Sequence, residues 1–353
     1  MRTMYEKTLQ KVQELLRNNP EWEERYERYS QRLNDECFID QIRYARDCFN
    51  VPAPFRVYMS VSMAMNKCTN THSAFELRFH GQSVAELYVP SNQSGNDIAL
   101  KVKCTPSIYT ALESAQMADA AKRLENYAQS KKIFWHDTEA QDFRKIYTEL
   151  EQKMVSNTAI KLTGQPEHEM ESELLRNYAQ KSSKDKEVSQ IQPIIMNGTN
   201  ACFQMPTPLG ASQAKKGADY IKYSAQRGGG IDILARMGIG RGTTLAVLEL
   251  KDQNNGSEPP EKAICQAIAY ATFLRELLRS KSGQAWWNFF GFQGQIPQVL
   301  HLKAIVVMPN EPGTSVVFGG QELKIGDNGD SIKLGYIYRK NVKKGLEQIE
   351  CID

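Results

Sequence analysis

Three ionisable residues lie where the sequence favours apolar strands. Asp232 falls in the run GGGIDILARM, and Glu249 and Lys251 fall near the end of the run TTLAVLELKD. Burying a charge in a strand costs several kcal/mol unless another charge pairs with it or a metal ion binds it. Carboxylates bind hard cations such as Mg²⁺, and an ammonium group stabilises charge developing on a phosphate. These residue types therefore suggest metal-assisted cleavage of a phosphodiester bond.

Two strands and a glycine-rich turn are expected to position these groups. Strand side chains alternate with period two, so Glu249 and Lys251 point to the same face. Between the two runs, residues 237–242 contain three glycines, which suit a hairpin connection. The hairpin is predicted to bring Asp232 back alongside Glu249.

The next predicted element is a helix over residues 261–278. Its buried face is expected to carry one polar residue, Gln266, one turn before Tyr270. The remaining members of that face are Ala263, Ala267, Phe273, Leu274 and Leu277.

Asp232 followed by Glu249-Leu250-Lys251 resembles the D…(D/E)-x-K signature of the PD-(D/E)XK, or restriction-endonuclease-like, nuclease superfamily. Ile231 stands where the signature has proline, a replacement that the superfamily often shows. Gln266-x-x-x-Tyr270 resembles the Q-x-x-x-Y motif of the RecB-like and Cas4-like members, in the same order along the chain.

The resemblance implies a fold and a mechanism. The fold is α/β, with a C-terminal restriction-endonuclease-like αβββαβ core over about residues 166–308 and a mixed central sheet flanked by helices. Asp232, Glu249 and the backbone carbonyl of Leu250 would bind Mg²⁺, for which Mn²⁺ would substitute. Lys251 would assist the attacking water. Gln266 and Tyr270 would order Lys251 or the scissile phosphate.

The resemblance also implies a glutamate on the first core helix, aimed at the metal site. The stretch PEHEMESELLRNYAQ begins with Pro166 and acidic residues, as a helix N-terminus does. Glu171 shares the apolar face of this helix, whereas Glu173 falls on the polar face, so Glu171 is the first candidate and Glu173 the second. Stabilisation of the helix dipole is an equally weighted alternative for Glu171.

DNA is the partner that the resemblance implies. The net charge of the whole chain is only +3, but residues 210–251 hold seven basic and three acidic residues. A basic rim would attract phosphate, and a solvated basic loop is the alternative. The candidate nucleic-acid contacts are Lys215, Lys216, Lys222 and Arg227. The long loop that contains three of them is a candidate substrate-contacting flap.

The chain has 353 residues, 41% of them hydrophobic, which favours two domains. We expect a separate α+β N-terminal domain of unknown role over residues 1–155 and the nuclease-like domain over 156–353. Residues 1–50 read as helices that serve for packing or for a homodimer interface. Residues 191–196 and 201–205 could pair as strands, and 299–308, 316–318 and 332–338 are further predicted strands. The aromatic run 286–290 is expected in the core.

Several classes of protein are disfavoured by the sequence. No apolar run reaches about eighteen residues, and acids occupy the place of a signal-peptide core, so we expect a soluble cytoplasmic protein without membrane contact. No G-K-[ST] motif occurs, so no nucleotide cofactor is expected. The seven cysteines are scattered, which departs from the iron–sulfur pattern of some family members.

Two alternatives to a nuclease remain open at this stage. The domain could be a catalytically inactive nuclease fold that binds nucleic acid or a protein partner. Glu249 and Lys251 could instead form a structural ion pair, which would confer no affinity for metal.

Overall fold

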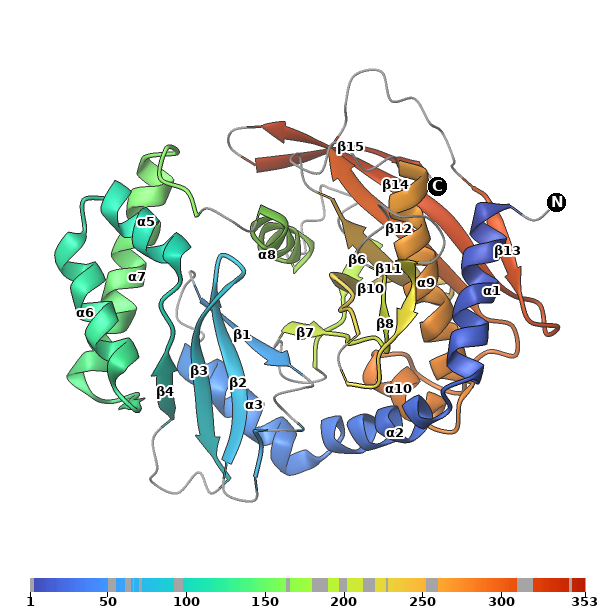
Figure 1. Cartoon of the computed structure of the whole chain (residues 1–353), viewed down its shortest axis with the longest axis horizontal. Helices are drawn as coiled ribbons and strands as arrows, with labels where there is room; N and C mark the ends of the chain where they lie inside the picture. Colours follow the sequence, from blue (N-terminus) through green and yellow to red (C-terminus); the bar gives the residue numbers. More distant parts are fainter. Residues whose placement is uncertain are drawn as a thin grey trace. The chain divides into compact units, whose positions relative to one another are not determined.

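The computed structural model describes two compact units, which we treat separately (Figure 1). Unit 1 comprises Met1–Gln31, Leu174–Ile194 and Gln204–Asp353, and unit 2 comprises Arg32–Glu173 and Ile195–Phe203. The structure describes all residues except 1–2, 50–54, 61–64, 66, 70–71, 92–97, 163–165, 180–189, 197–201, 212–219, 227, 252–259, 310–319, 343–344 and 353.

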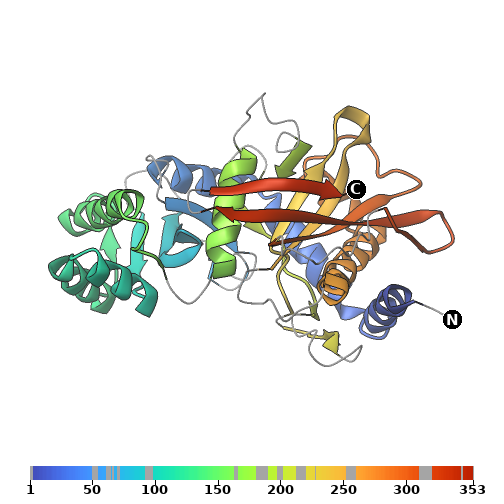
Figure 2. The same ribbon diagram turned by 90° about the horizontal axis from the view of Figure 1, so that it is seen from above.

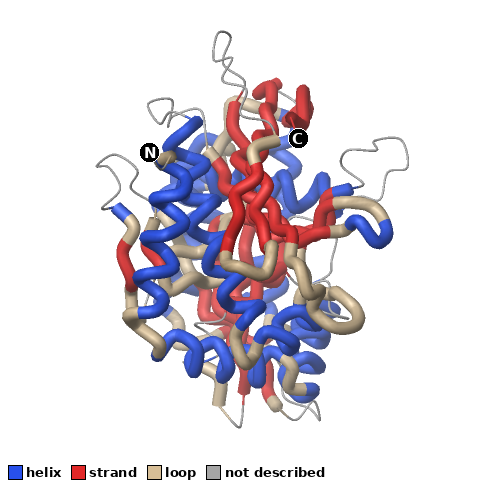
Figure 3. The backbone as a smooth tube through the Cα atoms, turned by 90° about the vertical axis from the view of Figure 1, so that its right-hand side faces the viewer, coloured by secondary structure: helices blue, strands red, loops and turns tan. Residues whose placement is uncertain are grey.

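Unit 1 is built on a mixed sheet with the strand order β13-β14-β12-β11-β10-β6, and β15 pairs with β14 (Figures 1 and 3). Strand β12 runs parallel to β11 and β14, and the other pairs are antiparallel. The strands are β6 (Ile191–Pro193), β10 (Ile233–Met237), β11 (Thr244–Leu250), β12 (His301–Pro309), β13 (Glu322–Ile325), β14 (Asp330–Val342) and β15 (Gly345–Ile352). A separate two-stranded sheet pairs β8 (Leu209–Gly210) with β9 (Lys222–Tyr223).

The predicted hairpin between β10 and β11 is confirmed. Gly238 and Gly240 have φ of +120° and +57°, a region that favours glycine, and a short 3₁₀ turn spans Gly240–Gly242. Of the seven residues in β11, six are buried, as expected for a strand between two neighbours that is covered by a helix. The hairpin therefore fixes the register of the two strands whose far ends carry the predicted site.

Helices α1 (Met4–Arg17) and α9 (Pro260–Arg279) lie side by side in unit 1 (Figures 1 and 2). The apolar stripe of α1 is buried, including Leu9, Val12 and Leu16, and a capping box of Thr3 and Glu6 starts the helix. Helix α9 in turn packs on β11 and β12. The apolar stripe of α1 is thus buried within the unit, and a homodimer through the N-terminal helices stays a prediction.

The aromatic run contributes to the core of unit 1, as predicted. It forms α10 (Gly283–Phe289), in which Trp286, Trp287 and Phe289 are buried. The Trp286 ring packs against Tyr26 of α2 (Glu21–Leu33), at a centroid distance of 6.0 Å.

Unit 2 contains a second sheet, with the order β5-β4-β3-β2-β1-β7. Helix α3 packs on β1, β2 and β3, and α6 and α7 pack near β4 and β5 (Figure 1). The strands are β1 (Phe55–Ser60), β2 (His72–Phe79), β3 (Gln82–Pro90), β4 (Ala99–Val102), β5 (Ile133–Phe134) and β7 (Cys202–Gln204). The helices are α3 (Glu36–Phe49), α5 (Pro106–Ser114), α6 (Ala118–Gln129), α7 (Thr138–Ser156) and the first half of α8 (Pro166–Ala179).

The predicted class, α/β with helices and mixed sheets, agrees with the structure. The compact units differ from the predicted division at residue 155, because the N-terminal residues 1–31 belong to unit 1, where α1 packs on α9. The predicted pairing of 191–196 with 201–205 is reduced to one bridge, Ile195 to Cys202, since β6 pairs with β10 and β7 with β1. Residues 316–318 lie outside the described residues.

No helix in the described part of the chain combines the length and the apolar character needed to cross a bilayer.

A buried carboxylate fixes the end of α9 to the start of β14. Asp330 is fully buried, and its oxygens accept hydrogen bonds from Arg275 Nε at 2.8 Å, Arg279 Nη2 at 2.6 Å and the Leu300 amide at 2.8 Å. Burial alone would raise the pKa of Asp330, but the hydrogen bonds, those from Arg279 and Leu300 foremost, lower this pKa well below its usual value. The carboxylate therefore stays charged and holds two arginines of α9.

We predict that Asp330→Ala lowers the free energy of unfolding by about 3–5 kcal/mol, because it removes the fully buried anion that two half-buried guanidinium groups share. Urea unfolding followed by tryptophan fluorescence reports mainly on unit 1, which contains Trp22, Trp286 and Trp287, whereas Trp135 belongs to unit 2. Because the pKa of Asp330 is lower in the folded than in the unfolded chain, this carboxylate stabilises the fold fully above its unfolded pKa of about 3.9. That stabilisation is lost as the pH falls below this value. The difference in the free energy of unfolding between wild type and Asp330→Ala should therefore shrink below about pH 4. Exposed Asp327→Ala is the control, and equal midpoints for Asp330→Ala and wild type at pH 7 would contradict the prediction.

Candidate active site

Asp232 directly precedes β10, and the strand register carries it to the end of β11. Ile233 is opposite Leu248, so the preceding residue reaches the level of Glu249 and Leu250. The Leu250 amide donates a hydrogen bond to Asp232 Oδ2 at 2.8 Å. The side chain of Asp232 is half-buried. The predicted approach of Asp232 to the end of β11 thus occurs, although Asp232 lies just outside the strand.

Glu249 and Lys251 form a buried ion pair at the end of β11. Lys251 Nζ lies 2.8 Å from Glu249 Oε1, and the two side chains are only 10% and 3% exposed. The Lys251 amide donates to the Val307 carbonyl at 2.9 Å, which continues the ladder with β12. Both side chains therefore point to one face, as the alternation predicted, and desolvation makes each depend on its partner.

Helix α9 adds two polar groups from above this strand end. Lys251 Nζ donates to Gln266 Oε1 at 3.2 Å, and Gln266 Nε2 makes a long hydrogen bond of 3.5 Å to the Tyr270 hydroxyl. Gln266 and Tyr270 are both buried. The four-residue spacing places them on one helical face. A continuous series of polar contacts therefore runs from Glu249 through Lys251 and Gln266 to Tyr270.

Tyr270 remains a neutral phenol at ordinary pH. Burial raises the pKa of Tyr270, the Glu249 carboxylate raises it further, and Asp232 adds to the effect, whereas hydrogen bonds with Gln266 and the Ala211 backbone oppose it.

A glycine allows the backbone to approach Tyr270 closely. A Cβ atom on Gly229 would lie 2.2 Å from the Tyr270 hydroxyl oxygen and 3.2 Å from the Leu209 carbonyl oxygen. Gly229 is held there by its amide, which donates to the Leu209 carbonyl at 2.6 Å, and by its carbonyl, which accepts from Thr207 N at 2.8 Å. Gly229 therefore packs directly against the hydroxyl group of Tyr270.

The described contacts of Glu171 lie in unit 2. Its Oε1 accepts a hydrogen bond of 2.5 Å from the Tyr58 hydroxyl and lies 4.0 Å from Arg78 Nη1. Its Oε2 lies 3.4 Å from His168 Nδ1. Glu171 is buried and faces the core side of α8, as its position on the helical wheel predicted. Its support of a metal ion stays a prediction, as does the secondary candidacy of Glu173.

The predicted nucleic-acid contacts are represented by one described residue. Lys222 lies in β9 and is exposed to solvent. Lys215, Lys216 and Arg227 lie outside the described residues, so the basic rim and the flap stay predictions.

The donor set of this site suits a magnesium ion better than a softer metal. Within the described ranges, no group of three or more His, Cys, Asp or Glu side chains is arranged to hold a metal. Mg²⁺ in phosphoryl-transfer sites uses one or two carboxylates together with water and substrate oxygens, rather than a complete protein cage. Asp232 and Glu249 provide two carboxylates beside one ammonium group, so the charges fit a divalent cation.

A scan against protein-family models, a search of curated proteins and a search of solved structures each found no match for this chain.

Three contributions to the site could not be deduced from the motifs. They are the Leu250 amide that orients Asp232, the Ala211 backbone at Tyr270, and Gly229. The run of three glycines at 228–230 is the one signal of them in the sequence, since glycine permits close approach of the backbone. Gly228 packs closely on the Thr207 carbonyl and Gly229 on Tyr270.

We predict that Gly229→Ala lowers the free energy of unfolding by about 1–3 kcal/mol, because the new methyl group overlaps a buried tyrosine that cannot move freely. Urea unfolding followed by tryptophan fluorescence measures this change. Gly242→Ala is the matched control, since a Cβ atom there meets no atom within 4 Å, and it should change stability by less than about 0.5 kcal/mol. Equal effects of the two substitutions would show that Gly229 does not pack as described.

Proposed function

We propose that this protein is a metal-dependent nuclease of the PD-(D/E)XK type that hydrolyses phosphodiester bonds of DNA. The observation that carries the proposal is the network at the end of β11. Lys251 lies between the Glu249 carboxylate and the Gln266 amide, at 2.8 and 3.2 Å, with Asp232 anchored to the adjacent Leu250 amide. A cation, two carboxylates and an amide are thus gathered at the end of a largely apolar, buried strand.

The order of elements supports the same proposal. Helix α8, strands β6, β10 and β11, helix α9 and strand β12 follow the αβββαβ order that the resemblance implies, with β7, β8 and β9 inserted between β6 and β10. In the sheet, β6, β10, β11 and β12 are consecutive neighbours. Helix α9 provides the crossover between the parallel strands β11 and β12, and this brings Gln266 over the end of β11.

Asp232 and Glu249, with the Leu250 carbonyl, would hold the Mg²⁺ or Mn²⁺ ion. When bound, such an ion polarises a phosphoryl oxygen and lowers the pKa of a bound water. DNA is favoured as the substrate by the family resemblance alone.

The protein's own groups act by holding charge in a fixed geometry. Lys251 would stabilise the negative charge on the attacked phosphate and orient the water, since a preorganised ammonium in a buried site is worth more than one in water. Gln266 would limit the positions of Lys251 through its hydrogen bond, and the neutral Tyr270 would orient the Gln266 amide. Asp232 would be kept in place by the Leu250 amide.

We predict that Asp232→Ala weakens Mn²⁺ binding by at least about tenfold. Lys251→Ala should lower the rate of metal-dependent DNA cleavage by about 10²–10³-fold, the effect of removing one preorganised charge-stabilising donor. Isothermal titration with Mn²⁺ and cleavage of supercoiled and single-stranded DNA, on the same preparations, measure both quantities.

Asp327→Ala and Lys324→Ala, both exposed in unit 1, are matched controls that should behave as wild type. If wild type binds no metal, Glu249 and Lys251 form a structural ion pair. If wild type binds metal and DNA without cleaving it, the domain is an inactive binding module. Cleavage at the wild-type rate by Asp232→Ala and Lys251→Ala would rule out the assigned residues.

A separate prediction concerns Glu171. If this carboxylate supports the metal ion, Glu171→Gln will weaken Mn²⁺ binding by about 10–100-fold, as loss of a supporting group near a metal does. If it serves only the contacts with Tyr58, Arg78 and His168, titration with Mn²⁺ will give the wild-type affinity and only the unfolding midpoint will fall.

A further inference from the structure

Tyr26 of α2 connects the core of unit 1 to the segment that precedes the site. Its side chain is buried, and its ring packs edge-on against Phe273 of α9 at a centroid distance of 4.9 Å. Its hydroxyl group donates a hydrogen bond of 2.8 Å to the Pro206 carbonyl. The ring is thus fixed on the site helix while the hydroxyl holds a different segment of backbone.

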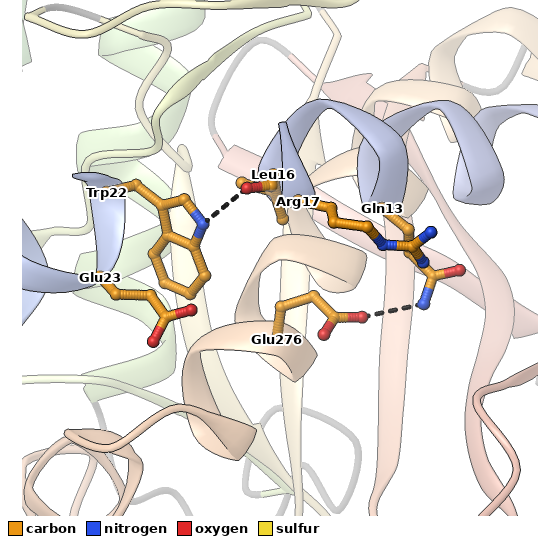
Figure 4. A pocket seen from close by; sticks show the side chains of 6 residues that line it. All are labelled: Gln13, Leu16, Arg17, Trp22, Glu23 and Glu276. Carbon is orange, nitrogen blue, oxygen red and sulfur yellow. Dashed lines mark hydrogen bonds between the residues drawn. The ribbon is translucent and has the colours of Figure 1, made fainter. Parts of the chain in front are cut away.

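The corner between α1 and α2 is itself fixed to α9 (Figure 4). Gln13 Nε2 donates to Glu276 Oε1 of α9 at 2.9 Å. Trp22 Nε1 donates to the Leu16 carbonyl at 3.2 Å, and the Trp22 ring packs edge-on against Phe273 at 5.8 Å. These groups border a pocket of about 220 Å³ whose walls come from α1, α2 and α9. The helix that carries Tyr26 is therefore held on α9 by several contacts.

The segment that Tyr26 holds runs alongside the residues before Asp232. Pro206 forms a bridge with Gly230, and the Ile231 amide donates to the Met205 carbonyl at 2.9 Å. Asp232 is the residue after Ile231, and Gly229, three residues before Asp232, contacts Tyr270. The Arg25 guanidinium, one residue before Tyr26, donates to the carbonyls of Ser224 and Ala225, further along the chain.

We infer that Tyr26 is a positioning residue for the nuclease reaction, acting through the Pro206 carbonyl on the backbone that presents Asp232. The inference rests on the proposed function. Gln266 and Tyr270 belong to α9, whereas Asp232 belongs to the segment bonded to residues 205–207. The Tyr26 hydroxyl joins these two bodies, so it acts together with the Leu250 amide on the position of the Asp232 carboxylate relative to the Lys251–Gln266 pair. A shift of a ligand carboxylate of the order of 1 Å suffices to slow a positioned reaction strongly.

Tyr26→Phe tests this inference, because it removes the hydroxyl and keeps the packed ring. We expect amide exchange at Thr207, Gly229 and Ile231 to become about fivefold faster, the factor for one lost hydrogen bond, with α9 amides unchanged. We expect kcat to fall by about fivefold while KM stays within about twofold, since substrate binding groups are untouched.

Tyr29→Phe is the matched control on the same helix, since no hydrogen bond joins its hydroxyl to a described residue, and it should match wild type in both measurements. Unchanged exchange at the three amides in Tyr26→Phe would overturn the inference, as would a uniform rise that includes α9. Faster exchange at the three amides with unchanged kcat would overturn it too.

If wild type cuts no DNA, the proposed function fails, and the affinity for Mn²⁺ replaces kcat as the readout. Equal affinities for Mn²⁺ in Tyr26→Phe and wild type would then overturn the inference.

Discussion

The buried pair of Glu249 and Lys251 is the constraint that the elements around the candidate site have to satisfy. A charged side chain buried at the end of an apolar strand, with a paired strand on each side, is stable only if other protein groups replace its hydrogen bonds to water. Lys251 can partner Glu249 because the strand period puts both on one face, and the remaining partners must come from other elements. The parallel pairing of β11 with β12 requires a crossover connection, and α9 is that crossover. The topology thus brings the Gln266 amide to Lys251.

The burial that makes the ion pair costly also shifts the pKa of a neighbouring group, Tyr270. Burial of the hydroxyl foremost, and then the Glu249 and Asp232 carboxylates, raise the pKa of Tyr270, so the phenol stays protonated. A neutral phenol can hold an amide in one orientation without adding charge. Gly229 lets the backbone close over this hydroxyl, so orientation and exclusion of water come from one contact.

Sequence patterns predicted the parts of this site that depend on local periodicity. The hairpin followed from glycines between two apolar runs, the common face of Glu249 and Lys251 from the strand period, and the proximity of Gln266 to Tyr270 from helical spacing. Contacts between distant segments have no such signature. Nothing in the residues around Pro206 or Tyr26 indicated that they would meet, and Ile191 and Cys202, close in sequence, belong to strands of different sheets. The contacts of Glu171 with Tyr58 and Arg78 are equally non-local.

Burial of an ion pair rarely increases stability by itself, since well-packed apolar residues of similar volume serve a fold as well or better. β11 would pack between its neighbours with leucine or methionine at positions 249 and 251, and α9 would cover it with leucine at 266. A stable fold therefore does not require the three polar side chains that meet there, nor a carboxylate at Asp232 oriented by the neighbouring amide. Local departures from apolar patterning that cost stability are expected where a protein performs its function. A purely structural pair would account for Glu249, Lys251 and the Gln266 amide that completes it. The proposed site for metal and phosphate would account for Asp232 and Tyr270 as well.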